Sequence, residues 1–203
     1  MGAGSKIALG CGGLLVLVLA VFGLTIMSSY NSLNSLNQAV EAQWGQVENV
    51  YQRRADLVPN LVATVKGAAA FEKDTFTAVT EARAKVGQMA SGPRPTTDPA
   101  ALERFQKAQE GLGSALSRLM VVVEKYPDLK ATQNFRDLQA QLEGTENRIA
   151  VERMRFNQAG QAFNTQRNSF PTVMLAGFFG ERFRDKAYFK AQAGSDQAPK
   201  VQF

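Results

Sequence analysis

The sequence predicts an all-α membrane protein, with a single N-terminal transmembrane helix followed by an up-down-up-down antiparallel four-helix bundle whose first and fourth helices are long. Three observations predict this fold. No charged side chain lies between Lys6 and Glu41, and residues 7–27 form an almost unbroken apolar run. After that run, apolar residues recur every three or four positions, and no convincing period of two appears.

The apolar run is long enough to cross a bilayer. Residues 7–27 would form a helix about 31 Å long, close to the thickness of the hydrocarbon core. A cleaved signal peptide is the alternative, but its basic flank would be only Lys6 and the amino terminus, and the run exceeds the usual length of a signal core. We therefore interpret residues 1–6 as a short flank and residues 7–27 as a membrane anchor.

The first bundle helix, about residues 28–66, is expected to continue directly from the anchor. Pro59 lies inside it and lacks an N–H, so we expect a kink or local break near Asp56. Arg54 falls on the apolar seam and is therefore a candidate interior charge. The seam consists of Leu33, Leu36, Val40, Trp44, Val47, Tyr51, Arg54, Val58, Leu61 and Val65.

Three further helices complete the expected bundle of residues 28–169. The second covers about residues 71–89 and ends at a loop rich in Gly and Pro. The third covers about residues 99–125, with Asp98 as its N-cap. The fourth covers about residues 128–169 and carries apolar residues seven apart, a spacing typical of a supercoiled seam: Phe135, Leu142, Ile149, Phe156, Phe163 and Phe170.

An interior Arg54 needs a partner, and the register of the helices favours Glu146 on the fourth helix. The alternative is that a kink at Pro59 turns Arg54 toward solvent. The two readings differ in energy, because a buried pair that loses one member costs about 3–5 kcal/mol, against about 0–1 kcal/mol for an exposed pair.

The segment 170–190 combines aromatic and basic residues and is expected to return to the membrane surface. An even number of antiparallel helices brings the chain back to its starting level, where rings suit the acyl boundary and cations suit anionic headgroups. The alternative is that the rings pack against the bundle or a neighbouring subunit. Residues 191–203 are expected to be a flexible tail. The candidate membrane-interface residues are Phe178, Phe179, Arg182, Phe183, Arg184 and Lys186.

Composition excludes several kinds of chemistry. The chain has no histidine, and its one cysteine, Cys11, lies in the anchor. This removes Ser-His-Asp and Cys-His catalysis and His-ligated zinc. Carboxylate or lysine chemistry remains formally open without support, so we expect no enzymatic activity, no cofactor and no metal. The net charge of +5 is mild and both signs alternate along helical faces, so no nucleic-acid partner is expected.

Two motifs are specific: Gln52-Arg53-Arg54 followed by Pro59-Asn60-Leu61-Val62, and Thr145-Glu146-Asn147-Arg148-Ile149-Ala150. With these motifs the chain resembles the LemA family of bacterial membrane proteins, from Tyr30 to about Phe189. The resemblance implies a single N-terminal span and a helical-bundle domain, and it implies no enzymatic activity. One departure is phenylalanine at positions 156 and 163, where the family commonly has tyrosine. The residues that carry the resemblance are Tyr30, Asn31, Trp44, Gln52, Arg53, Arg54, Asp56, Leu57, Pro59, Asn60, Leu61, Val62, Ala82, Arg83, Tyr126, Pro127, Leu129, Lys130, Ala131, Thr145, Glu146, Asn147, Arg148, Ile149, Ala150, Arg153, Asn157, Asn164, Phe170 and Pro171.

These features together favour a non-enzymatic, membrane-anchored helical scaffold that presents a surface to a protein partner or to copies of itself. The alternative is a lipid-sensing or membrane-remodelling protein that acts on membrane lipids through segment 170–190. The expected location is the bacterial inner membrane, crossed once. Lys6 flanks the span on one side, and the first Lys or Arg on the other is Arg53, so the positive-inside rule places the C-terminal domain outside the cytoplasm.

Overall fold

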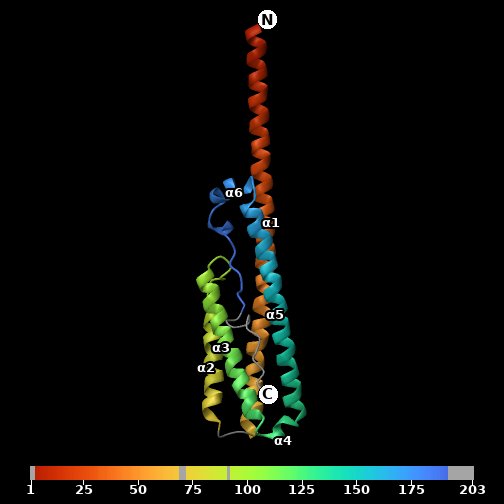
Figure 1. The fold of residues 1–203 in the computed structure, drawn as a ribbon, viewed down its shortest axis with the longest axis vertical. Coiled ribbons are helices and arrows are strands. Elements are labelled where there is room, and N and C mark those ends of the chain that lie inside the picture. The colour runs from red at the N-terminus through yellow and green to blue at the C-terminus, as the bar shows by residue number, and fades with distance from the viewer. Residues whose placement is uncertain (1–2, 69–71, 91, 192–203) are drawn as a thin grey trace, which may run out of the picture.

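The computed structural model describes residues 3–68, 72–90 and 92–191, and their side chains from residue 12 onward except at residues 68 and 90. Within these residues every regular element is helical, as the sequence predicts. Helix α1 (Ala3–Ala68) runs the length of the molecule, and its N-terminal part projects alone beyond the other helices (Figure 1). The other elements are α2 (Lys73–Ala90), α3 (Pro99–Val123), α4 (Pro127–Lys130), α5 (Gln133–Asn168), α6 (Thr172–Leu175), and the 3-10 helices η1 (Ala176–Phe179) and η2 (Glu181–Phe183).

The long helices alternate in direction, but they pack chiefly as two pairs. Helix α1 packs along α5, α2 packs along α3, and α2 also touches α1. A groove separates α3 from α5, with α1 as its floor. The closed four-helix bundle expected from the sequence is therefore not confirmed, although α1 and α5 are the longest helices, as expected.

The expected fourth helix is interrupted near its start. It begins as the single turn α4, breaks, and resumes as α5. The hydroxyl of Thr132 accepts a hydrogen bond from the backbone N–H of Phe135 at 3.3 Å and so caps the new helix. The Asp98 cap of α3 is as expected, since its carboxylate accepts from the N–H groups of Ala100 and Ala101 at 2.9 and 3.2 Å.

Helix α1 continues through Pro59 without the break that the sequence suggested. A proline at this position leaves the carbonyl of Ala55 without its usual intrahelical donor. The Nε atom of Arg83, on α2, donates to that carbonyl at 2.9 Å. A side chain from a neighbouring helix thus replaces the bond that the proline cannot make, which removes one reason for the helix to end.

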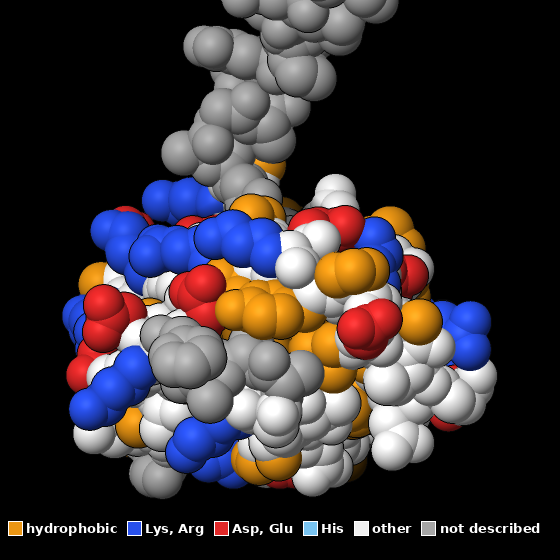
Figure 2. Space-filling model, turned by 90° about the horizontal axis from the view of Figure 1, so that it is seen from below, with side chains coloured by type: hydrophobic (Ala, Val, Ile, Leu, Met, Phe, Trp, Pro, Cys, Tyr) orange, Lys and Arg blue, Asp and Glu red, His pale blue; other side chains and the backbone are white. Residues whose placement is uncertain are grey.

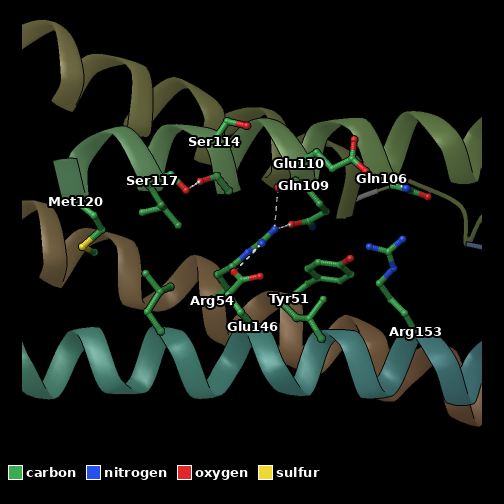
Figure 3. Close-up of a pocket in the computed structure, with 14 residues that line it drawn as sticks. Tyr51, Arg54, Gln106, Gln109, Glu110, Ser114, Ser117, Met120, Glu146 and Arg153 are labelled. Carbon is green, nitrogen blue, oxygen red and sulfur yellow. Dashed lines mark hydrogen bonds and ion pairs between the residues drawn. The ribbon is translucent and has the colours of Figure 1, made fainter. Parts of the chain in front are cut away.

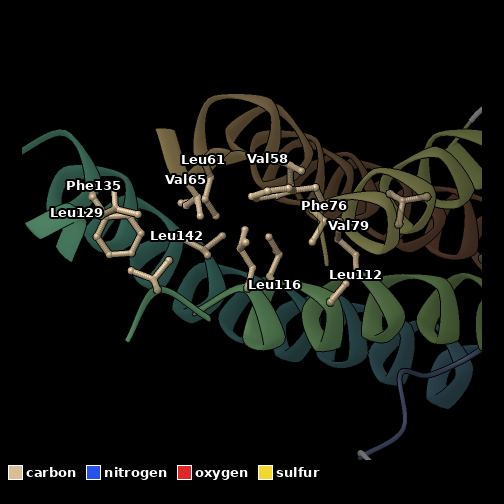
Figure 4. Close-up of a cluster of buried hydrophobic side chains, with 14 residues drawn as sticks. Val58, Leu61, Val65, Phe76, Val79, Leu112, Leu116, Leu129, Phe135 and Leu142 are labelled. Carbon is tan, nitrogen blue, oxygen red and sulfur yellow. The ribbon is translucent and has the colours of Figure 1, made fainter. Parts of the chain in front are cut away.

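The predicted seam of α1 is buried, with Leu36 only half-buried. Its lower half packs into a core shared by α1, α2, α3 and α5, with contributions from Val58, Phe76, Leu112 and Leu142 (Figure 4). The upper half of the seam packs into a second core, the upper core. Among the described residues, this core contains no residue of α2 and includes residues that follow α5 in the chain. The buried residues of that core are Leu33, Val40, Trp44, Val47, Tyr51, Leu102, Phe105, Ile149, Phe156, Phe163, Ala176, Phe183, Ala187 and Phe189.

The seven-residue repeat of α5 ends one step early. Phe135, Leu142, Ile149, Phe156 and Phe163 are buried, but Phe170 is 80% exposed. Helix α5 stops at Asn168, so Phe170 no longer shares the helical register that turns the other five residues inward.

The end of the bundle away from the apolar segment has a mixed surface. Lys, Arg, Asp and Glu side chains lie interspersed with apolar ones over the face seen in Figure 2. Such mixing is typical of a solvated surface rather than of a nucleic-acid footprint.

Candidate functional site

Arg54 is the buried charge at the centre of the bundle. Its side chain is 4% exposed, and its Nη1 atom lies 2.8 Å from Oε1 of Glu146 on α5, the partner expected from the register. Its Nη2 atom donates to the backbone carbonyl of Gln109 on α3 at 3.0 Å and also to the side-chain oxygen of Gln109 (Figure 3). One guanidinium therefore connects three helices.

The environment of Arg54 is only partly closed. Glu146 is 44% exposed on its side chain, so solvent screens part of the ion pair. The ring of Tyr51 lies 5.1 Å from the guanidinium carbon, which adds a cation–π contact. The Nε atom of Arg54 is buried and has no hydrogen-bond partner among the described residues. The two terminal nitrogens of the Arg54 guanidinium thus have hydrogen-bond partners among the described residues, and its Nε atom has none.

The groove beside Arg54 has a volume of about 620 Å³. Burial raises the pKa of the Tyr51 hydroxyl, while the charges of Arg153 and Arg54 oppose that shift. The charged side chains that line the groove are Arg54, Arg153, Glu110 and Glu146, so the lining carries no net charge. Its lining residues are Tyr51, Arg54, Gln106, Gln109, Glu110, Gly113, Ser114, Leu116, Ser117, Met120, Leu142, Glu146, Ile149 and Arg153.

The chain after α5 returns to the end of the apolar segment before it turns back. The hydroxyl of Thr172, in α6, lies 3.5 Å from that of Ser29 on α1, and the rings of Phe179 and Tyr30 meet edge to face at 5.3 Å. Here the surface is strongly apolar. Phe170, Val173, Met174 and Phe178 are 80%, 47%, 67% and 87% exposed.

Two of the expected membrane-interface residues lie inside the protein. Phe183 is 1% exposed and stacks on Phe163 at 6.4 Å. Lys186 is 4% exposed, and its ammonium group donates to the side-chain oxygen of Asn37 at 2.6 Å and lies 4.7 Å from the ring centre of Phe163. Burial lowers the pKa of Lys186, and nearby Glu41 acts in the opposite direction. For these two residues the alternative of packing against the bundle describes the structure, and lipid contact does not.

The other expected interface residues have mixed surroundings. Phe178 is exposed, and Phe179 is half-buried against Tyr30. Arg182 is exposed and donates to the side-chain oxygen of Asn34 at 2.7 Å, while Arg184, also exposed, pairs with Glu181. The rings and cations of this segment therefore do not share one face.

Residues 184–190, here called the strap, run back along the bundle without regular secondary structure (dark blue in Figure 1). The amide N–H of Ala187 donates to the carbonyl of Thr96 at 2.9 Å, in the loop before α3. The ring of Phe189 stacks on Trp44 at 6.0 Å. Sequence reasoning did not predict the strap. The available signal was the seven-residue spacing of Asn157 and Asn164, whose side chains both bind it.

The expectations that fall on residues 192–203 lie outside the described residues. Within the described residues, no three or more Cys, Asp or Glu side chains gather in a way that could hold a metal ion. Nor does the groove beside Arg54 contain a histidine or cysteine that could act as a nucleophile or base.

Comparison with known proteins found a match to one protein family and similarity to three relatives. The LemA family model matches residues 43–203. Magnetosome proteins MamQ 2 and MamQ 1 of Paramagnetospirillum magneticum are each 28% identical over 200 residues, which cover 89% of this chain and 72% of each relative. Magnetosome protein MamQ of Magnetospirillum gryphiswaldense is 27% identical over the same shares of both chains. The resemblance read from the residues is thereby confirmed.

Proposed function

The chain belongs to the LemA family, and we propose that it is a non-enzymatic scaffold, anchored in a membrane, that presents a helical surface to protein partners and to copies of itself. One observation carries this proposal: α1 is a single helix from Ala3 to Ala68. The same helix supplies the apolar segment and the buried seam of the bundle. No loop separates them, so the helix joins the anchor directly to the bundle.

The exposed part of α1 supports the anchoring. It is the one helix among the described residues that is long and apolar enough to cross a membrane. From Leu14 to Leu24 its large apolar side chains are 54% to 67% exposed, with no other element packed on them. Apolar surface costs about 25 cal/mol per Å² in water, so a helix of this length gains greatly from a lipid environment.

The orientation we propose places the bundle outside the cytoplasm. Lys6 flanks the apolar segment on one side, and the basic residue that follows it on the other is Arg53, far beyond the flanking window. Alkaline phosphatase fused after Phe203 should therefore be active in whole cells. If only a reporter that is active in the cytoplasm works at this position, the bundle lies in the cytoplasm and the proposed orientation is wrong.

The scaffold role can be tested by the mass of the purified protein. The full-length chain extracted in mild detergent should give a protein mass, after correction for detergent, above its own 22.1 kDa in light scattering. The excess should correspond to further copies or to a stoichiometric partner. A strictly monomeric protein without any co-purifying chain, across several mild detergents, would contradict the proposal.

A second function, contact with lipid through the region after α5, is favoured by the exposed apolar cluster of Phe170, Val173, Met174 and Phe178. This cluster lies beside Ser29, at the end of the expected span. Rings in such a place can enter the acyl boundary, and a nearby basic side chain adds about 1 kcal/mol on an anionic surface.

Spin labels on the full-length chain in anionic liposomes would test this contact. All variants carry Cys11→Ser to remove the native thiol. A label at Phe178→Cys should be accessible to oxygen and shielded from a water-soluble nickel reagent. A control label at Val121→Cys, where the native side chain is 66% exposed on α3, should show the opposite. Equal accessibility to nickel at positions 178 and 121 would show that Phe178 does not contact lipid and would contradict this second function.

A further inference from the structure

The strap is held as a bound peptide would be, through its main chain. Asn164 donates to the carbonyl of Lys186 at 2.9 Å and accepts from its N–H at 2.7 Å. Asn157 makes the same pair with Phe189, at 2.9 Å in both directions. Gln106 on α3 pairs likewise with Lys190, at 3.1 and 3.3 Å. Each of these three amide side chains therefore occupies both the donor and the acceptor of one strap residue.

The spacing of the amides matches that of an extended chain. Asn157 and Asn164 are seven residues apart on α5, about 10.5 Å along a helix. Their targets, Lys186 and Phe189, are three residues apart, about 10 Å in extended chain. Gly160 lies between the two asparagines, and a Cβ there would already touch the ring of Tyr188 at 3.4 Å, so a side chain larger than that of alanine would meet the strap.

Side chains of the strap add specificity to this main-chain recognition. Ala187 and Phe189 are 5% and 6% exposed, and Phe189 meets the rings of Trp44 and Phe156 at 6.0 and 5.5 Å. The guanidinium of Arg153 lies 4.9 Å from the Phe189 ring centre and donates to the carbonyl of Lys190 at 2.8 Å. The groove that holds the strap, to which Trp44, Gln106, Asn157 and Asn164 contribute, thus fits the sequence of the strap well.

We propose that this groove also binds the strap of a second copy of the chain, so that neighbouring copies exchange straps. Exchange refills each groove with an identical segment and preserves its contacts, which makes it a low-cost route to assembly. The proposal rests on the membrane anchoring proposed above. Copies anchored by this helix stand at the same height and point the same way across the membrane, so that the strap of one copy and the groove of a neighbour lie at one level.

The connection between α5 and the strap can reach a neighbour. Residues 169–182 could span up to about 45 Å once the short helices α6, η1 and the start of η2 unwind and the buried Thr172 and Ala176 leave their positions, several times the distance of about 8–10 Å between packed helices. Gly180 lies in this connection with φ 86°, a conformation that other residues rarely adopt, and so provides a hinge. The connection also includes the exposed Phe178, whose side chain is 87% exposed and is therefore not what holds the strap in place.

Disulfide formation between two differently tagged copies tests the exchange. One copy carries Thr96→Cys and the other Ala187→Cys, both in a Cys11→Ser background, and both are co-expressed in one membrane. The Ala187 N–H lies 2.9 Å from the Thr96 carbonyl oxygen, so the two backbones are close together when a strap lies in a groove, and a bond between differently tagged copies requires the strap of one copy to lie in the groove of the other. Mild oxidation should give a heterodimer containing both tags.

Three controls make either result decisive. A single chain with both Thr96→Cys and Ala187→Cys should form an intrachain bond, which shows that the variants fold. Pairing Ala187→Cys with Val121→Cys, exposed on α3, should give at least tenfold less heterodimer. Adding Gly160→Leu, which fills the space beside Tyr188, should reduce both kinds of bond at position 96.

An intrachain bond without any heterodimer would overturn the exchange. Resistance of the protein to alkaline carbonate extraction, measured on the same membranes, separates the two proposals. Protein that stays in the membrane without a heterodimer refutes only the exchange, whereas protein released by carbonate refutes the anchoring on which it rests.

Discussion

Removing the charge of Glu146 should destabilise the bundle more than removing that of Arg54, although the two residues form one ion pair. Glu146→Gln leaves the Arg54 cation in place, 4% exposed, with only the neutral oxygens of Gln109 as full partners. Arg54→Met instead removes the buried charge and leaves a shorter, flexible apolar side chain. The freed carboxylate is 44% exposed and can be hydrated.

The magnitude follows from burial. Stranding a fully buried charge costs about 3–5 kcal/mol, and breaking an exposed pair costs about 0–1 kcal/mol. Because Glu146 is nearly half exposed and Gln109 still accepts hydrogen bonds, we expect about 1–2 kcal/mol for Glu146→Gln and about 0–1 kcal/mol for Arg54→Met. The double variant should resemble Arg54→Met alone, which gives a coupling energy of about 1–2 kcal/mol, roughly a tenfold change in the folding equilibrium.

Denaturant unfolding of the full-length chain in detergent measures this cycle. Trp44 is the sole tryptophan and is 1% exposed, so its fluorescence reports on the core. The control cycle uses Lys130 and Glu124, which lie 2.6 Å apart with side chains 50% and 64% exposed, and should couple by no more than about 0.5 kcal/mol. Two results would contradict this prediction: losses of unfolding free energy that add up in the double variant, or a larger loss for Arg54→Met than for Glu146→Gln.

Two further predictions concern Arg83 and Lys186, whose contacts in the folded chain the sequence did not predict. Arg83→Met should lower the free energy of unfolding by about 1 kcal/mol, because it leaves the Ala55 carbonyl without a donor. In a Pro59→Ala background the loss should be less than half of that, because the restored backbone N–H takes the place of Arg83. Equal losses in both backgrounds, measured by chemical denaturation, would contradict this. For Lys186, whose folded-state pKa is lowered, only the unfolded chain holds the proton between that pKa and the ordinary value of 10.5, so stability should rise with pH in this range. Lys186→Met should abolish that rise when unfolding is followed below pH 10, where the raised pKa of Tyr51 does not yet contribute, and an unchanged slope would count against the assignment.

The parts of the fold that the sequence predicted are those fixed by local periodicity. The seam from Leu33 to Val65 turns one face of α1 inward, and it does so whatever packs against it. The Asp98 cap is local for the same reason, because its acceptor and donors lie within three residues. Even the Arg54 position followed from the seam, since a charge on a buried stripe must find a partner.

The parts that the sequence did not predict depend on contacts distant along the chain. Phe183 and Lys186 belong to a segment with the composition of an interfacial one, yet both are buried, Phe183 against the ring of Phe163 and Lys186 beside Asn37. Their pattern is compatible with lipid or protein, and only tertiary structure decides between the two. Pro59 predicts a break from its own chemistry, whereas the compensating Arg83 lies on another helix. The groove between α3 and α5 has no periodic signature at all.

The central claim, that one continuous helix fixes the bundle to the membrane, is tested most directly by a thiol-labelling scan. Single cysteines are placed from residue 12 to residue 45 in a Cys11→Ser background, and intact cells are treated with a membrane-impermeant maleimide. We expect no labelling through residue 27, and from about Asn31 labelling that recurs every three to four residues, at the positions on the exposed face of α1. Uniform labelling across residues 12–27, or loss of the helical repeat where the bundle begins, would contradict it.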